Sequence, residues 1–192
     1  MNAQLQPTGS AYFLTRETMA AERHTLSVLV DNEPGILARI AGLFSARGFN
    51  IESLTVSEVQ HDQGLSRITV VTIATPKVLA QIKLQLERLV SVHRVHDLTA
   101  EGKSLERELA LIKVNAPPDR RAELTALRDV FAVRVADVGS DAMVFEICAT
   151  PEEIDSFEEL VRPHGIRELH RTGRIGMKRA SVRKPHRQRV LH

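Results

Sequence analysis

The sequence predicts an α+β fold built from two consecutive ferredoxin-like βαββαβ sandwiches. Short segments in which apolar and polar residues alternate, as in strands, are interspersed with segments in which apolar residues recur every three or four positions, as in helices. The order strand, helix, strand, strand, helix, strand occurs twice, over residues 24–99 and 107–176. This order builds four antiparallel strands backed by two helices.

The first unit contains clear boundary signals. Gly48 is placed to end the first helix, because glycine accepts the left-handed conformation that follows many helices. Asp62 and Gly64 mark a turn between two strands, and Thr75-Pro76 is a typical start of a helix. The predicted elements are a strand over 24–31, a helix over 35–47, strands over 51–59 and 66–75, a helix that opens at Thr75-Pro76 and a strand over 92–98.

The second unit repeats this order after a linker over residues 101–104. Pro117-Pro118-Asp119 opens its first helix, and Thr150-Pro151-Glu152-Glu153 opens its second. Its strands are predicted over 109–114, 133–138, 142–149 and 166–175, with the middle two joined across Gly139-Ser140-Asp141. Outside the two units, we expect residues 1–23 to form a disordered extension and residues 177–192 a basic tail.

Composition indicates an ordinary globular protein, with 43% hydrophobic and 26% charged residues. Residues 1–23 contain no apolar run longer than Ala11-Tyr12-Phe13-Leu14, which is too short for the core of a signal peptide, and no segment has the length of a membrane span. The single cysteine, Cys148, lies in an apolar strand pattern, so we expect a buried thiol and no internal disulfide. These features predict a cytoplasmic location.

The basic residues are unevenly distributed along the chain. Residues 169–192 hold eight of the 26 Lys and Arg and none of the 24 Asp and Glu. A basic tail on an acidic body fits contact with nucleic acid or an acidic partner, and it equally fits a solvated terminus. The tail lacks the interleaved aromatic residues of a base-stacking surface.

Most functional classes that use this topology are poorly supported by the sequence. RNA-recognition motifs need aromatic residues on the two central strands, and neither 51–59 nor 65–71 contains one. His93 and His96 are three apart on a predicted strand, so their side chains point to opposite faces and do not favour a metal site. No residue set has the pattern of a nucleophile with its base.

The turn that joins the first strand to the first helix is the best candidate site. Asn32, Pro34 and Gly35 lead the chain into a helix N-terminus, where the first N–H groups lack partners inside the helix and attract anions. Gly35 lets a ligand approach the backbone, and Asn32 has both a donor and an acceptor. The turn therefore suits a free amino acid, although such turns often serve only to cap a helix. Pro117-Pro118-Asp119 in the second unit offers no equivalent.

The first unit resembles a known regulatory family. The chain is similar to the small regulatory subunit of acetohydroxyacid synthase, also called acetolactate synthase, whose N-terminal half is an ACT domain that senses amino acids. The likeness covers residues 24–176, and the block over 47–56 is its most specific part. It rests on Leu26-Ser27-Val28-Leu29-Val30, Asn32-Glu33-Pro34-Gly35, Gly42-Leu43-Phe44-Ser45, Arg47-Gly48-Phe49-Asn50-Ile51-Glu52-Ser53-Leu54-Thr55-Val56 and Leu65-Ser66-Arg67.

This resemblance implies an effector-binding ACT domain over 24–99 and a ferredoxin-like domain over 107–176. It implies a non-catalytic chain without cofactors, which binds a large catalytic subunit that uses thiamine diphosphate, magnesium and FAD. The chain would activate that subunit and confer feedback inhibition by valine, sometimes by leucine or isoleucine. The family's carboxylate-binding turn corresponds to Asn32, Gly35, Ile36 and Leu37, and Asn50 and Ile51 would approach from the neighbouring chain of a homodimer.

Two departures and one alternative accompany this interpretation. Ala38 stands where several relatives have Ser or Thr, and the extension and the basic tail have no role that the sequence reveals. The alternative is a stand-alone ACT-domain regulator that senses amino acids and acts on transcription or another enzyme, for which a basic tail would suit DNA contact. Binding of a thiamine-diphosphate enzyme separates the two hypotheses.

Overall fold

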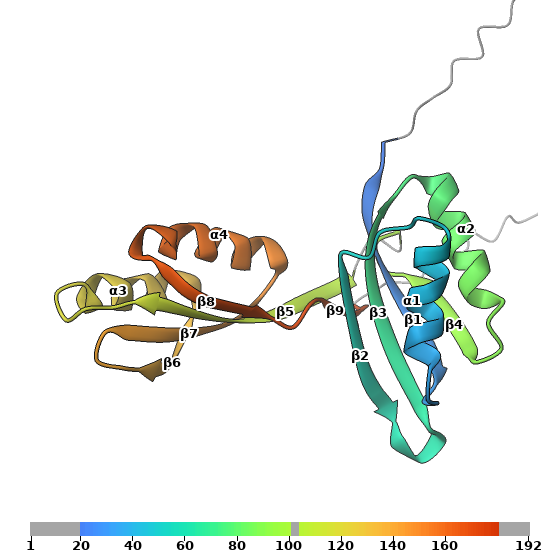
Figure 1. Cartoon of the computed structure of the whole chain (residues 1–192), viewed down its shortest axis with the longest axis horizontal. Helices are drawn as coiled ribbons and strands as arrows, with labels where there is room; N and C mark the ends of the chain where they lie inside the picture. Colours follow the sequence, from blue (N-terminus) through green and yellow to red (C-terminus); the bar gives the residue numbers. More distant parts are fainter. Residues whose placement is uncertain (1–19, 101–103, 181–192) are drawn as a thin grey trace, which may run out of the picture.

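The computed structural model describes residues 20–100 and 104–180, which form two layered α+β units (Figure 1). In the first unit, helices α1 and α2 cover one face of an antiparallel sheet whose strand order is β2-β3-β1-β4. Its elements are β1 (Glu22–Asp31), α1 (Ile36–Ala46), β2 (Ser53–Gln60), a short 3₁₀ helix (His61–Gln63), β3 (Leu65–Ala74), α2 (Pro76–Glu87) and β4 (Val92–Asp97).

The core of the first unit follows directly from the sequence periods. Alternate residues of β1 and β3 point toward the helices, and residues spaced by three or four on α1 and α2 point back. Burial of these side chains provides the main stabilisation of the unit. The buried set is Leu26, Val28, Val30, Ile68, Val70, Ala74, Ile36, Ile40, Phe44, Leu79, Ile82 and Leu86.

The second unit has the same topology, with the strand order β6-β7-β5-β8 and its own core around Phe145 and Phe157. The predicted α+β class and both βαββαβ orders are therefore confirmed. Its elements are β5 (Ser104–Asn115), α3 (Arg121–Phe131), β6 (Arg134–Val138), β7 (Ala142–Ala149), α4 (Pro151–Val161), a short 3₁₀ helix (Arg162–His164) and β8 (Ile166–Arg171).

Helix boundaries agree with the residues that mark them in the sequence. Gly48 has a φ of 67° just beyond α1, as a residue after a C-cap requires. Thr75 caps α2 through its side chain, and Pro76 occupies the first turn. Thr150 and Glu153 form a capping box at α4, in which each side chain accepts from the other's backbone N–H. Accepting these bonds holds the pKa of Glu153 below its usual range.

The prediction of one continuous strand over residues 166–175 is wrong. Residues 172–174 interrupt it, and a separate strand, β9 (Ile175–Lys178), pairs with residues 104–107 of β5. β5 is accordingly longer than predicted, and it takes in Ser104, which was assigned to the linker. Met177 and Lys178 likewise belong to β9 and not to a tail, because their backbone groups join the ladder with β5.

The expected burial of Cys148 is also wrong, since this residue is exposed. Met143, Phe145 and Ile147 of β7 face the core, so Cys148 lies on the opposite face of the sheet. At the other end of the chain, β1 begins at Glu22, which pairs with Ala74 and shortens the predicted extension. The rest of that extension up to residue 19, the linker over 101–103 and the tail over 181–192 lie outside the described residues.

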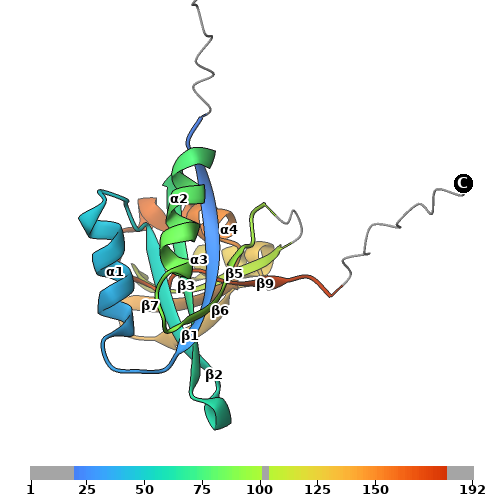
Figure 2. The ribbon, with the colours of Figure 1, turned by 90° about the vertical axis from the view of Figure 1, so that its right-hand side faces the viewer.

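The two units are joined by a ribbon of β5 and β9. β5 extends out of the second sheet, and with β9 it reaches the face of the first sheet opposite α1 and α2 (Figures 1 and 2). Gly176 of β9 lies so close to this sheet that a Cβ there would be 2.7 Å from Leu98 Cδ1. Among the described residues, no helix is both long and apolar enough to cross a membrane.

Candidate functional site

The turn between β1 and α1 has the geometry of an open helix N-terminus. Gly35 is the N-cap residue with a φ of 86°, and a Cβ added to it would have no neighbour within 4 Å. The cap lacks a side-chain hydrogen bond, and the first turn of α1 contains no acidic residue. A positive φ at this position favours glycine. The space above the turn is therefore free for a ligand.

Two backbone N–H groups of this turn remain available for an anion. Ile36 N donates to Glu33 O at 3.3 Å, and Arg39 N donates to Gly35 O at 2.9 Å. Among the backbone hydrogen bonds of the described residues, Leu37 N and Ala38 N have no acceptor. Such groups at a helix start carry partial positive charge and bind carboxylates or phosphates.

The turn is held in place by its polar neighbours. Asn32 N donates to Gly64 O at 2.6 Å, which ties the turn to the β2–β3 connection. The Glu33 carboxylate accepts from Arg39 Nη1 at 2.9 Å and from the Ser91 hydroxyl. His93 Nε2 lies 2.6 Å from Asp31 Oδ1 in an exposed pair. These contacts position the backbone before any ligand arrives, which lowers the cost of binding.

The six residues predicted for the effector site fall into two groups. Asn32, Gly35, Ile36 and Leu37 lie at the start of α1, where Ile36 is buried in the core and Leu37 is 41% exposed. Asn50 and Ile51 follow the end of α1, and the Asn50 carbonyl accepts from Thr72 Oγ1 at 2.6 Å. The helical residues 38–46 separate the groups, a rise of about 14 Å. The single chain does not bring them together.

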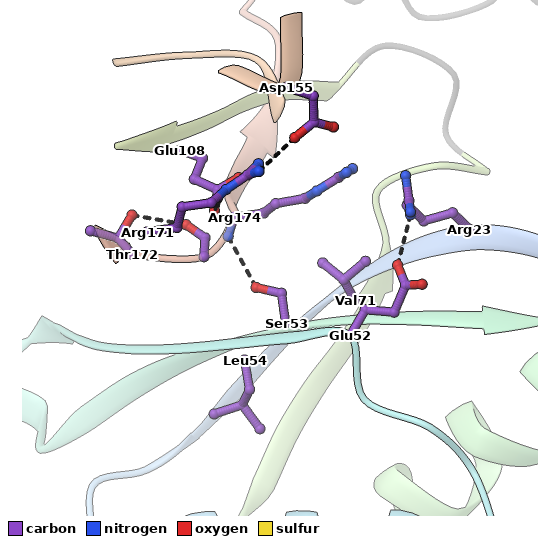
Figure 3. Close-up of a pocket in the computed structure, with 11 residues that line it drawn as sticks. Arg23, Glu52, Ser53, Leu54, Val71, Glu108, Asp155, Arg171, Thr172 and Arg174 are labelled. Atoms are coloured by element: carbon purple, nitrogen blue, oxygen red, sulfur yellow. Dashed lines mark hydrogen bonds and ion pairs between the residues drawn. The ribbon is translucent and has the colours of Figure 1, made fainter. Parts of the chain in front are cut away.

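A polar cleft of about 470 Å³ lies between the two units (Figure 3). Arg171, at the end of β8, extends toward Glu108 and Asp155, with its nitrogens 2.8–3.0 Å from the Glu108 oxygens and 2.5 Å from Asp155 Oδ1. The bonds to Glu108 raise the pKa of Arg171 above its usual range, so the guanidinium stays charged. On the other side of the cleft, Arg23 pairs with Glu52 at 2.8 Å.

The floor of this cleft is a close contact between residues 172–174 and β2. Thr55 Oγ1 donates to Thr172 O at 3.3 Å, and Arg174 N donates to Ser53 Oγ at 3.2 Å. Gly173 has a φ of 81°, and a Cβ there would lie 2.5 Å from Ser53 Oγ and 2.9 Å from Thr55 Oγ1. Only glycine fits this position without displacement.

Sequence reasoning missed this joint, although one signal was available. Gly173 stands inside an apparently continuous strand pattern, and an isolated glycine there often marks a bulge or a close backbone approach. The partners Ser53 and Thr55 give no signal of their own, because small polar residues are common on exposed strand faces. Only the tertiary structure places them opposite Gly173.

Comparisons with known families cover nearly all of the described chain. Residues 26–94 match the model of the AHAS small subunit-like ACT domain, and residues 107–180 match the model of the small subunit of acetolactate synthase. The matched residues include the turn at the start of α1 and the joint at residues 172–174.

Individual relatives agree with these family matches. The chain is 45% identical over 159 residues to a probable acetolactate synthase small subunit of Archaeoglobus fulgidus, covering 83% of this chain and 98% of that protein. It is 42% identical over 158 residues to the acetolactate synthase small subunit of Aquifex aeolicus, covering 82% and 81%. The crystal structure of the small subunit from Thermotoga maritima superposes with a TM-score of 0.76 at 34% identity, covering 84% of this chain and 99% of that one.

Replacing Gly173 tests the joint. Gly173→Ala should lower the free energy of unfolding by about 1–3 kcal/mol, because it adds backbone strain and forces a Cβ against Ser53. Urea denaturation measures the change. Ser53→Gly in the same chain should restore part of the loss by removing the clashing hydroxyl.

Gly42→Ala is the matched control for this replacement. Gly42 lies inside α1 and has no neighbour within 4 Å of an added Cβ, so alanine should stabilise the chain by roughly 0.5–1 kcal/mol. Equal stability of Gly173→Ala and the unchanged chain would show that residues 172–174 do not press on β2 in solution.

Proposed function

Because the chain belongs to the family of acetolactate synthase small subunits, we propose that it activates the large catalytic subunit and confers feedback inhibition by valine. In this proposal the chain contributes no catalytic group and holds no cofactor. Thiamine diphosphate, magnesium and FAD belong to the catalytic subunit, with which this chain assembles in the cytoplasm. Its own task is to sense the end product of the pathway.

The observation that supports this proposal best is the open first turn of α1. The N–H groups of Leu37 and Ala38, which have no backbone acceptor among the described residues, lie beside a left-handed Gly35 with free space above it. An amino-acid carboxylate satisfies such groups and interacts favourably with the helix dipole. The side chain of Leu37, 41% exposed, offers an apolar contact for the short branched side chain of valine.

In our proposal the site is completed by a second copy of the chain. Asn50 and Ile51 lie at the other end of α1 and reach an effector on the turn only if they come from a neighbouring protomer. β2 is an edge strand whose outer backbone groups pair with no strand among the described residues, and Val56 on it is 44% exposed. Edge strands of this kind readily pair with a second chain. A homodimer through the first unit therefore places two composite sites at one interface.

Reconstitution with the catalytic subunit of the same organism tests the proposed function. Addition of this chain should raise the rate of acetolactate formation, and valine should then lower it in a saturable manner. Calorimetric titration with valine, leucine and isoleucine, each alone, identifies the effector. A chain that neither binds nor activates the catalytic subunit would refute the proposal.

Gly35→Asp should weaken valine inhibition while activation of the catalytic subunit survives. The new carboxylate would lie where the carboxylate of valine binds, so like charges repel and the added atoms occupy the ligand's space. The inhibition constant for valine measures the effect, and a rise of roughly tenfold or more is expected. Unchanged inhibition would mean that the effector binds elsewhere.

Gly35→Asn is the matched control for the charge. Asparagine has almost the same shape as aspartate and tolerates the left-handed conformation, but it carries no charge. It should therefore impair valine binding less than Gly35→Asp. The difference between the two variants isolates the electrostatic part of the effect.

Asn50→Ala should reduce valine affinity although Asn50 lies beyond the far end of α1. The substitution removes an exposed side chain but keeps the carbonyl that accepts from Thr72, so the fold should persist. Analytical ultracentrifugation and calorimetry together follow dimerisation and binding. A chain that stays monomeric and still binds valine with full affinity would contradict the composite site.

A further inference from the structure

A second recess, distinct from the effector turn and the cleft, lies where the β5–β9 ribbon meets the first sheet. This groove has a volume of about 230 Å³ and opens on the face of the sheet opposite α1 and α2. One wall comes from β2 and β3 of the first unit, and the other comes from β5 and β9. Its principal residues are Val59, Arg67, Leu105, Arg107, Ile175 and Met177.

The rim of the groove is apolar and exposed. Ile175 is 53% exposed, Met177 is 58% exposed and Val59 is 37% exposed. Ile175 and Met177 share one face of β9, because side chains alternate along a strand, and Gly176 between them is pressed against Leu98. Large apolar side chains gathered at a recess mark interaction sites more often than solvated surface. Methionine adapts its shape to a partner.

The base of the groove is positively charged. Arg67 Nε is buried and has no hydrogen-bond partner, and no described carboxylate forms an ion pair with this guanidinium. Arg107 adds a second cation, whose Nη1 donates to the carbonyl of Glu106 at 2.7 Å and whose charge also acts on the Glu153 carboxylate. Among the described residues, no Asp or Glu lines the groove.

In the neighbouring cleft, by contrast, the arginines are paired with carboxylates. Arg171 pairs with Glu108 and Asp155, and Arg174 lies 3.5 Å from Glu106. A buried guanidinium nitrogen without a partner is unfavourable, and a carboxylate supplied from outside removes that penalty. Charge complementarity thus favours an acidic occupant at Arg67, and the exposed rim favours an apolar one.

We propose that this groove docks an acidic and apolar segment of the catalytic subunit. A carboxylate of that segment pairs with Arg67, and an apolar side chain next to it enters between Val59, Ile175 and Met177. This inference rests on the proposed function. It differs from the effector site because the groove lies on the face of the sheet opposite α1.

Because its two walls come from different units, the groove can couple docking to the arrangement of the units. One wall belongs to the first unit and the other to the ribbon of the second, so the width of the groove depends on how the units sit together. A partner segment that fits one width favours that arrangement over others, which is the differential affinity that regulation requires.

Binding of the purified catalytic subunit to the full chain tests the docking site. Arg67→Glu and Met177→Asp should each weaken the dissociation constant roughly tenfold or more, as changes at the centre of an interface do. Arg67→Glu should also flatten the dependence of affinity on salt, because a charge pair is lost. Valine binding by calorimetry should stay intact, which shows that both variants are folded.

Two matched controls make the same chemical changes elsewhere. Lys77→Glu reverses an exposed charge on α2, and Val90→Asp adds a carboxylate at a side chain that is 97% exposed. Both lie outside the groove and should bind the catalytic subunit as the unchanged chain does. A photo-crosslinking residue at position 177 should capture the catalytic subunit, and the same residue at position 90 should not.

The outcomes separate this inference from the proposed function. The docking site is overturned if Arg67→Glu and Met177→Asp bind the catalytic subunit with wild-type affinity, or if position 177 crosslinks to a second copy of this chain. In either case, activation of the catalytic subunit by the unchanged chain still supports the proposed function. Failure of the unchanged chain to bind or activate the catalytic subunit overturns both. Loss of binding in both groove variants, retained binding in both controls and a crosslink to the catalytic subunit support the docking site.

Discussion

The approach of residues 172–174 to β2 is the contact on which the arrangement of the two units depends. Gly173 permits it, and Thr172 and Arg174 on either side exchange hydrogen bonds with Thr55 and Ser53. From this point the chain turns into β9, which pairs with β5 and forms the ribbon against the first sheet. The cleft above the joint and the groove beside the ribbon both exist because the chain is interrupted here.

This contact also lies close in sequence to the proposed effector site. Ser53 follows Asn50 by three residues, and Glu52 between them pairs with Arg23 on the first unit's side of the cleft. A ligand that orders Asn50 and Ile51 at a dimer interface acts on the beginning of β2, where the second unit is attached. In this proposal, the route from the effector to the second unit is one short strand segment, without any need for a long chain of intermediates.

Short sequence patterns correctly predicted helix ends and turns. They failed for side-chain exposure and strand pairing, which depend on residues far apart in the sequence. Thr75 marks the start of α2 and Gly48 the end of α1, as expected, because capping depends on neighbouring residues. The turn at Gly35 was identifiable from the sequence for the same reason, and the structure adds its left-handed conformation. The exposure of Cys148 depended on which face of β7 meets the helices, and the β9–β5 pairing joins residues about seventy apart. Neither the exposure of Cys148 nor this pairing can be predicted from a short stretch of sequence. Arg67 likewise has no local signal, because only the tertiary structure brings β9 next to it.

The free energies of the hydrogen bonds at the joint are of the size expected in a regulated assembly. The two hydrogen bonds to β2 are long, at 3.2 and 3.3 Å, and a typical bond of this kind contributes a net 0.5–1.5 kcal/mol or so. Allosteric couplings lie in the same range, at about 1–3 kcal/mol. A joint built on a large apolar interface would resist a shift of that size. A joint held by a glycine contact and two hydrogen bonds to hydroxyl groups is instead of a size that such couplings can shift.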